Sequence, residues 1–183
     1  MRNINWRSKV VVVLMLLGPL SLPVYAAFNC PNDQTYCYEK IIWKRDINLG
    51  GEQLTENERA ILHSYIPNHY DYSIVKISNG SIVQESTTGF FADDSFKKLI
   101  ALFLLNPFNE TDGHVRPSEC TSGHPRGSTI VRQEFISEEE YDQRLTYNED
   151  LKNDAFPDSY SLPGENCRGY ANNMYDDGEN GLE

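Results

Sequence analysis

An Asn-Gly pair at positions 79 and 80 is the feature that most constrains the fold of this chain. It separates two runs rich in β-branched and aromatic residues, 71–77 and 81–85. Asn-Gly readily adopts the left-handed backbone of a two-residue hairpin turn, so the pattern predicts two neighbouring antiparallel strands. A third strand is expected over 128–136, where apolar and β-branched residues return.

Helical spacing of apolar residues and N-terminal capping signals predict four helices. They are expected over about 56–65, 96–104, 137–152 and 167–175. The segments 27–54, 106–127 and 157–164 contain Pro, Gly or Asn, and this composition is typical of irregular structure or loops. The expected fold class is α+β, a small antiparallel sheet packed on helices with the cysteine-bearing helix last.

The N-terminus has the organisation of a secretory signal peptide. Arg2, Arg7 and Lys9 precede an apolar stretch over 10–22, and Ala26 follows where a signal peptidase would cleave. The apolar stretch is short for a spanning helix, so we expect cleavage after Ala26 and no stable membrane insertion afterwards. The expected location is the bacterial periplasm or the exterior of the cell.

The predicted organisation therefore has four parts. They are a signal peptide over 1–26, an irregular segment over 27–54, an α+β domain over 55–178 and an acidic tail over 179–183. Without the three leader cations the chain has 13 basic residues against 27 acidic ones, a net charge of −14. This balance argues against a nucleic-acid partner, because phosphate contacts need a positive face.

The four cysteines have two interpretations in an exported protein. Cys30 and Cys37 lie close together near the mature N-terminus, and the expected arrangement is a local disulfide. Cys120 and Cys167 are either bridged to each other or free. The chain has no Cys-x-x-Cys pair and no paired histidines at metal-ligand spacing, so neither a metal site nor a cofactor is expected.

Cys167 is predicted to begin the last helix, with Asn166 at the N-cap position. Unpaired backbone N–H groups and the helix dipole stabilise a thiolate at such a position, which favours a nucleophile. His69, just before the first predicted strand, is the candidate general base. Gln84 or Glu85, on the partner strand of the hairpin, is the candidate group that orients the imidazole; since neighbouring residues alternate faces, only one of them can do so.

Several short segments resemble circularly permuted papain-like proteins, a group related to NlpC-type peptidases and lecithin:retinol acyltransferase-like proteins. The matching segments are Asn68-His69 before the first strand, the Asn79-Gly80 turn with Glu85, residues 135–141, Tyr160-Ser161-Leu162 and 166–171. In this group a histidine on an early strand meets a cysteine at the start of a late helix. The resemblance covers about residues 66–176 and departs from the usual pattern at Tyr70-Asp71, which follow the histidine.

The resemblance implies a permuted papain-like fold and a cysteine hydrolase or acyltransferase that acts on an amide bond. In a bacterial envelope, a peptide or a peptidoglycan stem peptide would be the substrate of such an amidase or endopeptidase. The alternative is a non-catalytic, disulfide-stapled binding or inhibitor protein, for which the acidic charge suits a cationic protein partner. The state of Cys167 distinguishes these two functions. The enzyme needs a free Cys167 thiol near His69, and the binding protein needs a disulfide between Cys167 and Cys120.

Overall fold

A computed structural model of the chain describes residues 30–31, 34–47, 53–65, 68–106, 108–118, 128–154, 158–161 and 166–176. The predicted leader over 1–26 and the predicted tail over 179–183 lie outside the described residues. The helices are α1 (Glu56–Tyr65), α2 (Phe96–Leu105), α3 (Glu138–Asn153) and α4 (Cys167–Asp176). The strands are β1 (Cys37–Arg45), β2 (His69–Ser78), β3 (Ser81–Ala92), β4 (Glu110–Pro117), β5 (Thr129–Ile136) and β6 (Asp158–Ser161).

The six strands form one antiparallel sheet in the order β5-β1-β2-β3-β4-β6. The predicted hairpin is confirmed as β2 and β3, and its turn has the positive φ angles that the Asn-Gly pair favours, 51° at Asn79 and 73° at Gly80. The four helices are also confirmed, so the protein is an α+β domain.

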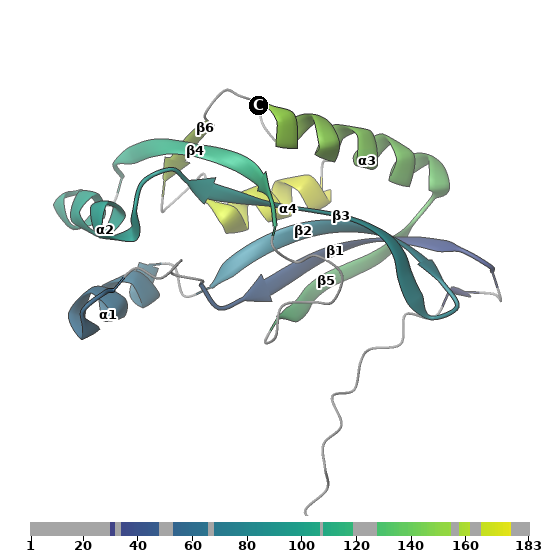
Figure 1. Cartoon of the computed structure of the whole chain (residues 1–183), viewed down its shortest axis with the longest axis horizontal. Helices are drawn as coiled ribbons and strands as arrows, with labels where there is room; N and C mark the ends of the chain where they lie inside the picture. Colours follow the sequence, from purple (N-terminus) through teal and green to yellow (C-terminus); the bar gives the residue numbers. More distant parts are fainter. Residues whose placement is uncertain are drawn as a thin grey trace, which may run out of the picture.

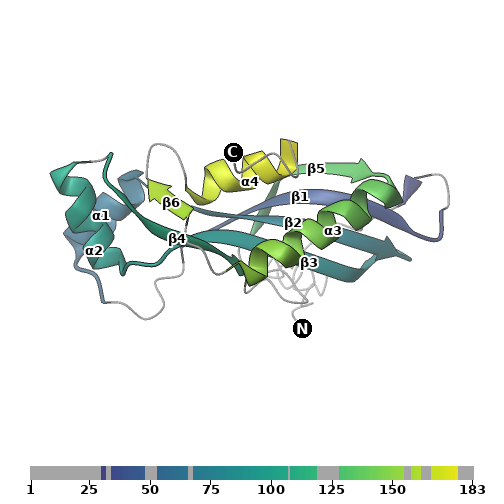
Figure 2. The ribbon, with the colours of Figure 1, turned by 90° about the horizontal axis from the view of Figure 1, so that it is seen from above.

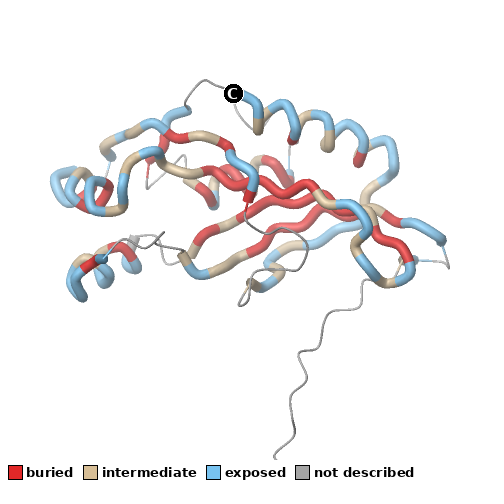
Figure 3. The backbone as a smooth tube through the Cα atoms, in the orientation of Figure 1, coloured by how far each residue is buried: buried red, intermediate tan, exposed pale blue. Residues whose placement is uncertain are grey.

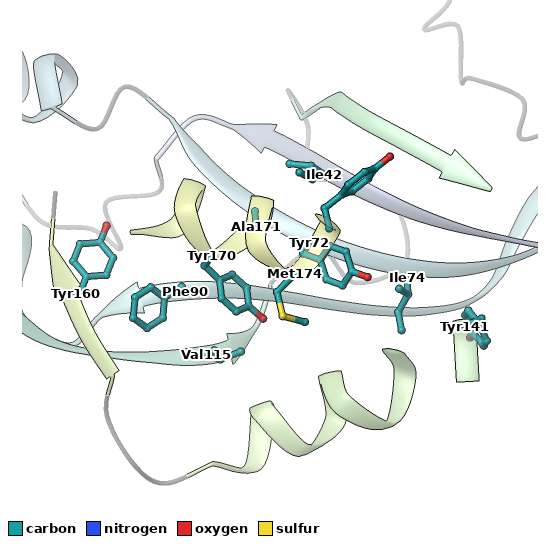
Figure 4. Close-up of a cluster of buried hydrophobic side chains, with 11 residues drawn as sticks. Ile42, Tyr72, Ile74, Phe90, Val115, Tyr141, Tyr160, Tyr170, Ala171 and Met174 are labelled. Atoms are coloured by element: carbon teal, nitrogen blue, oxygen red, sulfur yellow. The ribbon is translucent and has the colours of Figure 1, made fainter. Parts of the chain in front are cut away.

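Helices α3 and α4 cover one face of the sheet (Figures 1 and 2). Residues spaced by two along the central strands point toward these helices, as the alternation of strand side chains requires. The main core lies between them (Figure 4) and includes Tyr72, Phe90, Tyr170 and Met174. Figure 3 shows buried backbone running through the middle of the sheet, whereas much of α3 is exposed.

Helices α1 and α2 pack on each other at one end of the sheet (Figure 1). Their shared contact is a small apolar cluster of Leu54, Leu62 and Ile100. None of the helices in the described ranges is long and apolar enough to cross a membrane.

Three strands lie in segments that the sequence predicted to be irregular. The prediction was wrong for β1, which pairs with both β2 and β5 in the middle of the sheet. Its Ile41 and Ile42 are buried on opposite faces, so the strand lacks the apolar–polar alternation of a half-exposed strand. β4 contains one β-branched aliphatic residue and the four-residue β6 contains none, so β-propensity gave little signal for either strand.

The predicted disulfide between Cys30 and Cys37 is present, with the two Cα atoms 5.4 Å apart. Cys37 is the first residue of β1 and is buried with Ile41, Val75 and Ile77 on the face of the sheet opposite α4. The disulfide therefore attaches the chain before β1 to the far end of the sheet from α1 and α2.

Candidate functional site

Cys167 lies in the first turn of α4, as its sequence context predicts. The side-chain oxygen of Asn166 accepts hydrogen bonds from the backbone N–H groups of Arg168 and Gly169, at 2.9 and 3.1 Å, which caps the helix. Cys167 is a free, buried thiol, and its Sγ lies 3.9 Å from the carbonyl oxygen of Asn68. Cys120, the alternative partner, lies outside the described residues.

His69 is the first residue of β2, immediately after Asn68, and its ring is buried beside Cys167. The imidazole interacts with two side chains, those of Cys167 and Asp71. Nε2 lies 3.0 Å from Oδ1 of Asp71. The structure thus brings together the two residues that the sequence singled out, and it adds a carboxylate.

Asp71 is fully buried, and its two oxygens have different partners. Oδ1 faces His69, whereas Oδ2 accepts a hydrogen bond from Nε of Arg45 at 2.8 Å. Arg45 is the last residue of β1 and lies directly opposite His69 in the β1–β2 pairing. A buried carboxylate requires such a partner, because an unpaired charge is costly to bury.

The space for the histidine–aspartate pair is created by Gly89 on β3, which is the register partner of Asp71. A Cβ atom at Gly89 would lie 2.6 Å from Asp71 Oδ1 and 2.9 Å from His69 Nε2, closer than side-chain carbons approach. The hydrogen bond between the two residues therefore passes over the glycine. The ring of Phe91 stacks on the imidazole with centroids 4.5 Å apart and so fixes the plane of His69.

The electrostatics favour a protonated imidazole. Burial alone would lower the pKa of His69, but hydrogen bonds to Asp71 and Cys167 and the charges of these groups raise it to about 9. Burial raises the pKa of the Asp71 carboxyl, but hydrogen bonds to His69 and Arg45 and their charges hold this pKa below its ordinary value. Burial, with the charge of Cys167 as the second cause, raises the pKa of the neighbouring Tyr160.

The structure does not bring Gln84 or Glu85 to the imidazole. They pair with Lys76 and Val75 in the register of β2 and β3. Val75 is six positions along β2 from His69, about 20 Å at the rise of a strand. Glu85 instead accepts a hydrogen bond from the hydroxyl of Thr87 at 2.6 Å. The expectation that Gln84 or Glu85 orients His69 was therefore wrong, because both residues lie too far from the imidazole.

Asp71 is the functional candidate that sequence reasoning missed. The signal was present in the sequence, because residues two apart in a strand lie on the same face, and His69 and Asp71 have this spacing. The orienting carboxylate lies two positions further along the strand of His69, and not on the partner strand where the hairpin pattern favours it.

Within the residues that the structure describes, no three side chains of the His, Cys, Asp and Glu types are grouped closely enough to hold a metal ion. Comparison of the chain with models of known protein families, with curated proteins and with solved structures found no match. The assignment of a function to this chain therefore depends on the geometry around Cys167 and on the short sequence resemblance.

Proposed function

We propose that the protein is an exported cysteine hydrolase or acyltransferase that acts on amide bonds. The observation that supports this most is the buried series of contacts from Cys167 through His69 to Asp71. A nucleophile, a proton carrier and a group that orients the carrier are the parts that thiol-dependent acyl transfer needs. The location of Cys167 at the start of α4 adds backbone N–H groups that favour negative charge.

Each residue has a defined step in the proposed reaction. The Cys167 thiolate attacks the carbonyl carbon of the substrate amide, and the resulting oxyanion is stabilised by the N–H of Cys167 at the helix start. The protonated His69 gives its proton to the departing amine, which leaves a thioester on Cys167. Neutral His69 then removes a proton from water or from another acceptor, which attacks the thioester and restores the thiolate.

Asp71 and Arg45 act on the imidazole rather than on the substrate. Asp71 holds Nε2 of the imidazole, which limits the rotation of the ring beside Cys167. Arg45 fixes the second oxygen of Asp71 and balances its charge. We propose both as positioning residues for His69.

The arrangement also supports the proposed membership in the permuted papain-like group. The histidine strand β2 precedes the cysteine helix α4 in the chain, and α4 packs on the strand that carries the histidine. A peptidoglycan stem peptide is the proposed substrate, on the basis of the predicted export and of the resemblance.

The test of this proposal is thiol reactivity in the mature, non-reduced protein, mapped by mass spectrometry after brief treatment with iodoacetamide near neutral pH. We expect rapid labelling of Cys167 and a loss of at least tenfold in rate for His69→Ala. The matched control is His114→Ala, because His114 also bonds an aspartate, Asp93 at 2.6 Å, but is part-exposed and lies on β4. This variant should label at the wild-type rate.

Reactive protein would then be incubated with purified peptidoglycan, and the released fragments would identify the bond cleaved. A Cys120–Cys167 peptide recovered from the untreated protein would overturn the proposal and favour the disulfide-stapled binding protein. Slow labelling that is equal in wild type and His69→Ala would overturn it as well.

A further inference from the structure

One cation lies against an aromatic ring beside the candidate site, and a second cation is the strand partner of the residue that carries this ring. Arg168 follows Cys167 in α4, and its guanidinium carbon lies 5.8 Å from the ring centre of Tyr70. Tyr70 in turn follows His69 and is the register partner of Lys44 on β1. Tyr70 and Arg168 are therefore the residues that directly follow His69 and Cys167 in the chain.

The cluster lies on the face of the sheet that α4 covers. Partner residues of an antiparallel pair share a face, so Lys44 and Tyr70 point the same way. Tyr70 packs against the main core, to which α4 contributes Tyr170 and Ala171. Lys44, Tyr70 and Arg168 thus form one surface at the start of α4, which we call the cationic cluster.

Within the part of the chain that the structure describes, the cations of this cluster have no acidic partner within 4 Å. Most lysines and arginines of the described residues have an acidic partner within 4 Å, namely Lys40, Arg45, Lys98, Arg116, Arg132, Arg144 and Lys152. Over the same described residues, neither Lys44 nor Arg168 has one. In a chain with 27 acidic residues, two cations that lack an acidic partner among the described residues leave room for an anion from outside.

We propose that the cationic cluster binds a carboxylate of the substrate. This inference rests on the proposed function and narrows its substrate class to amides with a free carboxylate close to the bond that is cleaved. Arg168 would hold the carboxylate with paired N–H donors, and Lys44 would add a point charge. Tyr70 supports the planar guanidinium through its ring.

The test compares two alkylating agents of nearly equal size on the whole mature protein. In both reagents the thiolate displaces iodide from the CH₂ group and forms a C–S bond, so that a carboxymethyl or a carbamidomethyl group is added. Only iodoacetate is an anion. The measured quantity is the ratio of their rates at Cys167, relative to the same ratio in protein unfolded in urea. We expect the folded protein to favour iodoacetate by about threefold or more, since the two positive charges of the cluster attract the anionic reagent through partly aqueous surroundings.

Two variants test whether the cationic cluster causes the preference for iodoacetate. Arg168→Gln and Lys44→Gln should each lower the iodoacetate preference, and added NaCl should lower it in the wild type. Lys97→Gln, at an exposed lysine on α2, is the matched control and should leave the ratio unchanged. Because His69 is present in every variant, its charge does not contribute to the differences between them.

The outcomes separate this inference from the proposed function. If Cys167 reacts rapidly with iodoacetamide but the ratio is the same in all variants, the carboxylate site is wrong and the thiol hydrolase proposal stands. If Cys167 reacts with neither reagent, both are wrong. If the ratio falls equally in Lys97→Gln, net charge rather than the cationic cluster explains it, and the inference is overturned.

Discussion

His69 and Asp71 form a hydrogen-bonded pair within a single strand, with Nε2 and Oδ1 3.0 Å apart. The pair depends on the neighbouring strand as well, because Gly89 leaves the space that the two side chains occupy. A glycine inside a strand often marks a close approach of this kind. The geometry of the candidate site is therefore set by β2 and β3 together.

Gly89→Ala should damage the site more than the fold. The new methyl group would lie 2.6 Å from Asp71 Oδ1 and 2.9 Å from His69 Nε2, so the pair must separate. We expect a loss of about 1–3 kcal/mol in the free energy of unfolding, and at least a tenfold slower alkylation of Cys167. Urea unfolding and timed iodoacetamide labelling measure the two effects.

Gly80→Ala is the control for this substitution. Gly80 has a φ of 73° in the hairpin turn, at the other end of β2, so alanine there is strained without touching the site. We expect destabilisation by about 1 kcal/mol and normal labelling of Cys167. Fast labelling in Gly89→Ala would show that the histidine–aspartate pair does not control the thiol.

The raised pKa of His69 predicts how stability depends on pH. The ordinary value is 6.5 and the folded value is about 9, so the folded protein holds a proton that the unfolded chain releases. The resulting stabilisation is fully present below about pH 6.5 and is lost as the pH rises through about 9. Its upper limit is about 3 kcal/mol.

This dependence would be measured by urea unfolding between pH 6 and pH 9.5, in the wild type and in His69→Gln. The wild type should lose its advantage over the variant as the pH rises, whereas the curve of Gly80→Ala, which keeps His69, should run parallel to that of the wild type. Parallel curves for the wild type and His69→Gln would contradict a protonated His69 in the folded state.

The sequence predicted the parts of this fold that depend on local signals. The Asn79-Gly80 turn, the capping of α4 by Asn166 and the four helices all have short-range causes, and each was found close to its predicted place. β1 was missed because burial on both faces is a property of the finished sheet.

The residues of the candidate site also differ in whether the sequence alone could identify them. Cys167 and His69 were identifiable because their residue types and positions suit a nucleophile and its base. Arg45 and Gly89 were not, because each acts through a register partner, and register follows from strand order rather than from the residues themselves.

Arg45→Ala should be strongly destabilising, because it removes one of the two cationic partners of the fully buried Asp71 and leaves only His69 to balance its charge among the ion pairs of the described residues. Removal of one partner of a buried ion pair costs about 3–5 kcal/mol. The matched control is Arg132→Ala, which breaks the exposed pair with Asp176 and should cost at most about 1 kcal/mol. Urea unfolding of both variants at pH 7 measures the difference.

Asp71→Asn in the Arg45→Ala background supplies a second comparison. If the loss comes from the removal of a cationic partner of the buried carboxylate, neutral asparagine at position 71 should recover part of the stability, although Cys167 should still be labelled slowly. Equal stability losses in Arg45→Ala and Arg132→Ala would contradict the buried character of the Arg45–Asp71 pair.

Replacement of the disulfide by Cys30→Ala/Cys37→Ala should affect stability but not the reactivity of Cys167. The bridge closes a short loop of seven positions, for which chain entropy gives about 2–3 kcal/mol of stabilisation. Cys37 is eight positions along β1 from Arg45, about 26 Å, so the disulfide is remote from the site. Urea unfolding should show the loss, and iodoacetamide should label Cys167 at the wild-type rate. Slow labelling in a variant that is still folded would instead connect the disulfide to the geometry of His69 and Cys167.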